Sequence, residues 1–162
     1  MSDAAFNAAV RTVLAHEGGY VSDPADPGGE TKYGISKRAY PDLDIAALSQ
    51  AQAIAIYEKD WWDRYGYGRL PDAVGAKLFD LAVNMGAVPA HELLQRTCTD
   101  CGEPVAVDGR VGPLTVAAAT RCDQGELLAA LREQAAEHYR ALVAANPDLA
   151  RFLAGWLKRA AA

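Results

Sequence analysis

Glu17 is the residue whose type and position best suit acid–base chemistry. Apolar residues recur at i, i+4, i+7 and i+8 over residues 6–14, which is one face of an amphipathic helix. Glu17 falls in the last turn of that helix, where Gly18 or Gly19 supplies a left-handed stop. The negative end of a helix dipole disfavours an ionised carboxylate. A partly buried Glu17 is therefore expected to have a raised pKa and to act as a general acid.

Asp26 and Thr31 are the candidate partners of Glu17. Asp26 lies nine residues after Glu17 and Thr31 five residues after Asp26, in a Pro- and Gly-rich segment that predicts a tight hairpin. Glycoside hydrolysis usually needs a second carboxyl group as base or electrostatic partner, and Thr31 can orient a water molecule. The alternatives are a turn residue for Asp26 and a strand residue for Thr31. Other candidates for the second carboxylate are Asp23, Glu30 and Asp44.

A series of different short motifs extends along nearly the whole chain. They are Glu17-Gly18-Gly19-Tyr20, Asp23-Pro24-x-Asp26-x-Gly28-Gly29-x-Thr31-x-x-Gly34-Ile35, Leu78-Phe79-Asp80-x-Ala82-Val83-Asn84-x-Gly86, Leu94-Gln95, Asp108-Gly109-x-x-Gly112-x-x-Thr115 and Arg151-Phe152-Leu153-x-Gly155-Trp156. The series resembles glycoside hydrolase family 108, lysozyme-like N-acetylmuramidases found as phage or prophage endolysins and in bacterial secretion-activating proteins. The resemblance implies a catalytic Glu17, whereas Asp26 rests partly on spacing. That spacing also resembles phage-type lysozymes, with the gap before Thr31 one residue shorter.

Tyr20, Tyr33 and Asn84 are the predicted substrate-binding residues. Aromatic rings can stack on sugar rings in a cleft, and a buried amide such as Asn84 can hydrogen-bond a sugar; the alternative for each is a place in the core. His16 is interpreted as a surface histidine, with tuning of the Glu17 acid as the alternative, and Asp80 as taking part in a helix-facing hydrogen bond.

Helical patterns account for most of the chain. Ser49, followed three residues later by Gln52, forms a capping-box pattern. Further helices are expected to begin near residues 71, 89, 113 and 126, and a last one to follow Asn146-Pro147. Only residues 20–35 favour strand pairing. The predicted class is mostly α (α+β, lysozyme-like): a helical bundle with one small β-hairpin lobe near the N-terminus.

Residues 107–115 resemble the loop of helical peptidoglycan-binding modules. Two glycines permit tight turns, Pro113 begins a helix, and Asp108 and Thr115 brace the loop through backbone hydrogen bonds. We expect residues 1–95 to form a catalytic lobe and residues 96–162 a peptidoglycan-binding-like region packed on it.

Composition and charge limit which partners the protein is expected to bind and where it is expected to act. The chain has 162 residues, of which 51% are hydrophobic, and a formal charge of −5. That charge argues against nucleic acid, which calls for clustered Lys and Arg. Neither a secretory signal nor an 18-residue apolar stretch is visible. A monomer is expected that is made in the host bacterial cytoplasm, does not insert into the membrane, and acts in the periplasm or cell wall after release, in a phage setting by a holin.

Cys98, Cys101 and Cys122 are an odd number of thiols, which argues against a disulfide framework. Zinc would need Cys122 and either His91 or His138 as further ligands. The spacing fits no standard zinc motif, so small buried residues are the favoured interpretation, and no metal or cofactor is expected.

Three hypotheses follow. In the first, a muramidase cuts the β-1,4 bond from N-acetylmuramic acid to N-acetylglucosamine in peptidoglycan, with Glu17 as acid and Asp26 as base or electrostatic partner. In the second, a lytic transglycosylase uses Glu17 as its sole acid/base. In the third, the chain binds the wall without cutting it.

Overall fold

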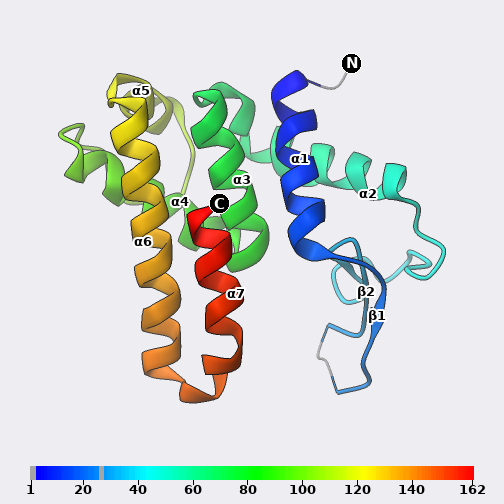
Figure 1. Cartoon of the computed structure of the whole chain (residues 1–162). Helices are drawn as coiled ribbons and strands as arrows, with labels where there is room; N and C mark the ends of the chain where they lie inside the picture. The colour runs from blue at the N-terminus through cyan, green and yellow to red at the C-terminus, as the bar shows by residue number, and fades with distance from the viewer. Residues whose placement is uncertain (1–2, 26–27) are drawn as a thin grey trace.

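The computed structural model describes residues 3–25 and 28–162, which fold into helices around one core with a small sheet at one side (Figure 1). In chain order the elements are α1 (Ala4–Glu17), β1 (Val21–Ser22), β2 (Glu30–Lys32), β3 (Ile35–Ser36), α2 (Gln50–Tyr57), the π-helix η1 (Glu58–Asp63), the 3-10 helix η2 (Tyr67–Arg69), α3 (Asp72–Met85), α4 (Ala87–Asp100), α5 (Pro113–Arg121), α6 (Gln124–Ala145), the 3-10 helix η3 (Pro147–Leu149) and α7 (Ala150–Ala161). The mostly α, lysozyme-like prediction is confirmed. No helix within the described residues is long and apolar enough to cross a membrane.

Helix α1 ends on Glu17, as its sequence pattern predicts. The Asp3 side chain caps its start by accepting a hydrogen bond from the Ala5 amide, and Gly18, with φ of 73°, ends it. Phe6, Val10 and Val13 are buried on one face, which packs against α3. Burying this face fixes the rotation of α1 and therefore the direction in which Glu17 projects.

The predicted hairpin is present and is extended by a third strand. The sheet order is β1-β2-β3, antiparallel throughout, with Val21 opposite Thr31 and Lys32 opposite Ile35. Tyr33 and Gly34 form the two-residue loop between β2 and β3, and both have positive φ, 53° and 80°. That is the signature of a type I′ turn, whose twist matches the strands it joins.

Helix α3 lies at the centre of the molecule and contacts α1, α4 and α6. It begins after Pro71 and ends at Gly86, whose φ is 99°. The capping box at Ser49 and Gln52 is also formed. Helix α4, however, begins at Ala87 and not at Pro89. Proline is tolerated in the first turn of a helix, where its missing N–H has no partner to lose.

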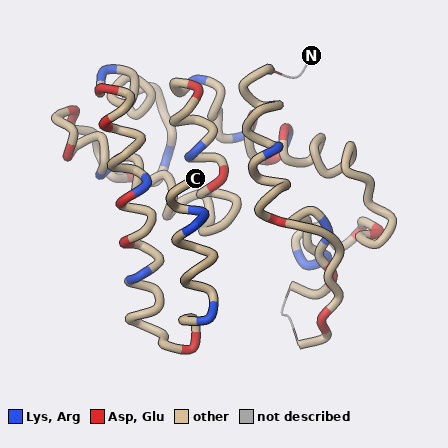
Figure 2. Tube along the Cα trace, viewed as in Figure 1, with Lys and Arg blue, Asp and Glu red and all other residues tan. Residues whose placement is uncertain are grey.

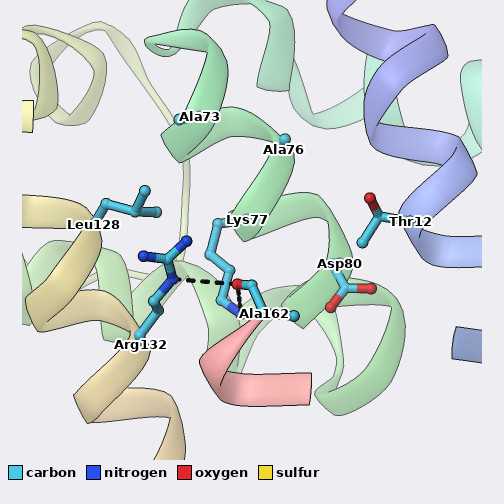
Figure 3. Close-up of a pocket in the computed structure, with 8 residues that line it drawn as sticks. All are labelled: Thr12, Ala73, Ala76, Lys77, Asp80, Leu128, Arg132 and Ala162. Atoms are coloured by element: carbon cyan, nitrogen blue, oxygen red, sulfur yellow. Dashed lines mark hydrogen bonds between the residues drawn. The ribbon is translucent and has the colours of Figure 1, made fainter. Parts of the chain in front are cut away.

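Helix α7 returns antiparallel beside α6, so that its far end comes to lie beside α3 and near α1 (Figure 1). Lys77 of α3 donates hydrogen bonds to the carbonyl oxygens of Arg159 (2.8 Å) and Ala162 (3.0 Å), and Arg132 of α6 donates to Ala162 (3.2 Å). Figure 3 shows Lys77 and Arg132 converging on Ala162 at the edge of a small cavity of about 180 Å³. These contacts hold the last turn of α7 against α3 and α6.

Candidate active site

Glu17 is held by an arginine from the opposite end of the chain. One guanidinium nitrogen of Arg159 lies 2.9 Å from Glu17 Oε1, although 142 residues separate the two. The Glu17 side chain keeps 22% of its surface exposed, whereas Arg159 is almost fully buried. The carboxylate therefore has a fixed orientation, and part of its surface remains open to a ligand.

Arg159 also pairs with a second carboxylate, that of Asp80. Its Nε lies 3.1 Å from Asp80 Oδ2 and a terminal nitrogen 2.9 Å from Oδ1, so the contact is bidentate. Burial by itself would lower the pKa of Arg159, but Asp80 and then Glu17 raise it above its ordinary value. The guanidinium thus stays charged between the two acids.

His16 completes this network from the residue before Glu17. Its Nδ1 lies 3.0 Å from Asp80 Oδ1. His16 is an exposed residue, as interpreted, but its ring is held against Asp80. Asp80 makes the expected helix-facing contacts: it accepts from Arg159 of α7, and His16 of α1 lies within hydrogen-bond distance. Sequence reasoning missed Arg159, which no motif near Glu17 signals.

The Tyr33-Gly34 turn also packs against the Glu17 side chain. Tyr57 of α2 donates its hydroxyl hydrogen to the carbonyl oxygen of Tyr33 (2.8 Å). A Cβ added to Gly34 would overlap the Tyr57 hydroxyl and lie 2.8 Å from Glu17 Cγ. Burial first and the negative charge of Glu17 second raise the pKa of Tyr57, which keeps it a neutral donor. Only glycine allows this close approach of the turn to the carboxylate.

Two hollows flank this carboxylate. The first, which we call the groove, has a volume of about 450 Å³ and is lined by Gly34, Ile35, Ser36, Ala39, Tyr40, Tyr57, Asp60, Trp61, Arg64, Tyr65 and Val83. The second, which we call the α7 hollow, has a volume of about 400 Å³ and is lined by His16, Glu17, Asn84, Arg151, Phe152, Gly155, Trp156 and Arg159. Gly34, which touches Glu17, lines the first, and Glu17 itself lines the second. The groove borders Val83 of α3, and the α7 hollow borders the next residue, Asn84.

The groove contains polar and aromatic groups together. The Tyr40 hydroxyl donates to Asp60 (2.8 Å), and the Arg64 guanidinium lies 5.4 Å from the centre of the Tyr65 ring. Burial and the hydrogen bond to Asp60 raise the pKa of Tyr40. Asp60 and Trp61 lie on the π-helix η1, a feature often found at functional sites. No motif in the sequence signals this irregular turn.

The predicted substrate residues have different surroundings. Asn84 lines the α7 hollow, where its Oδ1 accepts a hydrogen bond from Tyr139. Tyr33 lies in the turn beside Glu17, with the Lys32 ammonium 5.7 Å from its ring centre. Tyr20 is exposed and donates its hydroxyl hydrogen to Glu30 (3.0 Å). Tyr20 and Tyr33 line neither hollow.

Of the two proposed partners of Glu17, only Thr31 lies within the described residues. Asp26 lies outside the described residues. Thr31 is half-buried on β2 and lines neither hollow. Of the alternative carboxylates, Glu30 accepts from the Tyr20 hydroxyl. Asp23 accepts from the Ala25 amide and Asp44 from the Ala47 amide, each within its own turn.

The loop that precedes α5 is braced as expected, with an additional anchor. Asp108 accepts from the Arg110 amide (2.9 Å), while Gln95 of α4 donates to Asp108 and accepts from the amides of Asp108 and Gly109. His91 ties the same loop to η2: its Nδ1 donates to the Gly109 carbonyl (2.9 Å), which leaves Nε2 to accept from Tyr67 (2.8 Å).

The three cysteines lie away from both hollows. Cys98 and Cys122 are buried and Cys101 is half-buried, and all three are free thiols. Burial raises the pKa of Cys98 to about 12, so it is an unreactive thiol. Within residues 3–25 and 28–162, no cluster of three His, Cys, Asp or Glu side chains is arranged to hold a metal.

Comparison with known proteins identifies two regions. Residues 10–86 match the family described as Glycosyl hydrolase 108, and residues 89–161 match the family described as Predicted Peptidoglycan domain. A solved structure, "Structure of Brucella abortus SagA", is similar over 96% of this chain and 89% of that chain, with 27% sequence identity and a TM-score of 0.78. No curated protein matches the chain.

Proposed function

The chain belongs to the glycosyl hydrolase 108 family through residues 10–86 and carries a peptidoglycan domain in residues 89–161, and from this premise we propose the bond that it cuts. The protein is a glycoside hydrolase that acts on peptidoglycan. The bond is the β-1,4 link from N-acetylmuramic acid to N-acetylglucosamine. The observation that supports this most directly is the partly exposed Glu17 carboxylate, flanked by two hollows that can receive sugars on either side of the bond.

Glu17 donates its proton to the glycosidic oxygen as the bond breaks. Asp26 acts as the base or as the electrostatic partner of the sugar cation, and Thr31 orients the attacking water. Tyr20, Tyr33 and Asn84 bind the strand. Residues 1–95 form the catalytic lobe, and residues 96–162 pack on it as the wall-binding-like region.

We further propose that the protein is a phage or prophage endolysin. It works as a monomer, is made in the cytoplasm of the host bacterium, and reaches the wall after release, with a holin as the releasing factor. Neither metal nor cofactor takes part in the chemistry.

Glu17→Gln tests the role of the acid, because glutamine keeps the size and hydrogen-bonding reach of glutamate and carries no acidic proton. Release of soluble fragments from purified peptidoglycan should fall to background, while the circular dichroism spectrum and melting temperature stay close to those of the wild type. Normal lysis by a folded Glu17→Gln protein would exclude Glu17 as the acid.

Mass spectrometry of the fragments that the wild type releases identifies the reaction. Reducing N-acetylmuramic acid ends are expected. Reducing N-acetylglucosamine ends would mean that the other glycosidic bond is cut. Anhydro-muramic ends would mean a lytic transglycosylase, and Asp26→Asn should then leave the rate almost unchanged. Sedimentation with walls without any fragments would mean a binding protein.

A further inference from the structure

The α7 hollow combines groups from both halves of the chain. Glu17 and Asn84 contribute from the hydrolase half, and Phe152 and Trp156 from α7, in the peptidoglycan half. A ligand in this hollow would contact the candidate acid and α7 together. Helix α7 therefore forms part of the lining of this hollow beside Glu17, and it also packs on the catalytic half.

The α7 side of the hollow is aromatic. The rings of Phe152 and Trp156 are stacked, with centres 5.6 Å apart and an interplanar angle of 27°, and Trp156 stacks in turn on Tyr139 (5.2 Å, 25°). Phe152 is 42% exposed, whereas Tyr139 is buried and bonded to Asn84. The stack thus runs from the core to the surface and presents a rigid apolar face that suits a sugar ring.

The same side is cationic. The Arg151 guanidinium lies 4.7 Å from the centre of the Phe152 ring, and among the described residues no carboxylate pairs with it. Arg159, by contrast, is fully engaged by Glu17 and Asp80. Helix α7 carries Arg151, Lys158 and Arg159 and no acidic residue, although the whole chain has a charge of −5 (Figure 2). This local charge is complementary to an anionic ligand.

We propose that Arg151, Phe152 and Trp156 form a subsite for the anionic, muramic acid-bearing part of the glycan strand. This inference rests on the function proposed above, because it needs peptidoglycan as the ligand. Phe152 and Trp156 pack against a sugar ring. Arg151 pairs with the lactyl carboxylate of muramic acid units that carry no stem peptide, since a stem peptide converts this carboxyl group to an amide. N-acetylglucosamine has no such carboxylate, so Arg151 distinguishes the two sugars and sets which one lies on the α7 side of Glu17.

The test measures binding in the Glu17→Gln background, in which the ligand is not cut. Two probes of equal length are titrated calorimetrically: a peptide-free N-acetylglucosamine–N-acetylmuramic acid oligosaccharide, and an N-acetylglucosamine oligosaccharide without carboxyl groups. Arg151→Gln should weaken binding of the first probe roughly tenfold, the loss typical of one charge-assisted hydrogen bond, and leave the second unchanged. Phe152→Ala should weaken both, because ring stacking does not depend on the carboxylate.

Lys158→Gln is the matched control, since it removes the same charge from an exposed position on the same helix outside the hollow. It should affect neither probe. Equal losses on both probes with Arg151→Gln, equal losses with Lys158→Gln, or no binding of the muramic acid probe would overturn the proposal. A wild type that binds selectively but releases no fragments would refute the proposed function and leave the subsite intact.

Discussion

At the residue scale, one guanidinium serves two carboxylates. Arg159 holds Glu17 at 2.9 Å and Asp80 through two contacts, and Asp80 also receives His16. Removing one partner of a buried ion pair leaves the other charge without compensation, which costs far more than the pair contributes relative to apolar residues. The expected role of Arg159 is therefore twofold: it fixes the orientation of Glu17 and allows Asp80 to be buried.

Arg159→Met is expected to destabilise the fold by roughly 3–5 kcal/mol, because Asp80 would stay buried without its bidentate partner. The free energy of unfolding in urea measures the effect. Arg140→Met is the control, since Arg140 pairs with Glu137 at the surface, where such a pair contributes at most about 1 kcal/mol. If both variants lost equal stability, the buried network would have no special role.

At the element scale, the β2–β3 turn determines how closely the sheet approaches α1. Tyr33 and Gly34 adopt the left-handed conformation that a type I′ turn requires, and the chain then passes directly over Glu17 and Tyr57. Gly18 ends α1 directly after Glu17, and this turn approaches the Glu17 side chain.

Gly34→Ala is expected to lower the rate of wall hydrolysis roughly 100-fold, because its methyl group would displace Glu17 by a distance that catalysis does not tolerate. Gly102→Ala is the matched control: Gly102 also has a positive φ (92°), but nothing lies within 4 Å of an added Cβ. Each variant should lose about 1–2 kcal/mol of stability from backbone strain. Equal activity in the two variants would show that the turn does not position Glu17.

At the scale of the whole molecule, side chains of residues 89–161 form hydrogen bonds and ion pairs with residues 10–86. Arg159 joins α7 to α1 and α3, Asn84 of α3 accepts from Tyr139 of α6, and His91 joins η2 to the loop before α5. The two family regions therefore share buried polar contacts, and we expect their stabilities to be coupled.

His91 makes this coupling depend on pH. It is buried and neutral, and burial lowers its pKa from the ordinary value of 6.5. Below about pH 6.5 the unfolded chain binds a proton that the folded chain resists, so the free energy of unfolding should fall as the pH falls. Protonation would also remove the acceptor that Nε2 offers to Tyr67. Urea unfolding at pH 7.5 and 5.5 should show a smaller acid-induced loss in His91→Asn than in the wild type. Identical losses would assign the acid sensitivity to other groups.

Local patterns in the sequence determined the elements and the candidate acid. The apolar period of residues 6–14 and the glycines after Glu17 predicted that a helix ends on this residue, and the Ser49 capping box and the braced loop before α5 were equally readable. These features could be predicted because hydrogen bonds among residues a few positions apart produce them.

Only the tertiary structure decided what surrounds Glu17. Arg159 lies 142 residues away, and neither helix periodicity nor spacing indicates which cation will meet which acid. The contact of His16 with Asp80, the π-helix that carries Asp60, and the α7 side of the hollow likewise depend on how helices pack. Such contacts are fixed when apolar faces of distant segments are buried together. The sequence therefore determined where Glu17 lies on its helix, and the packing of α1, α3 and α7 determined its neighbours.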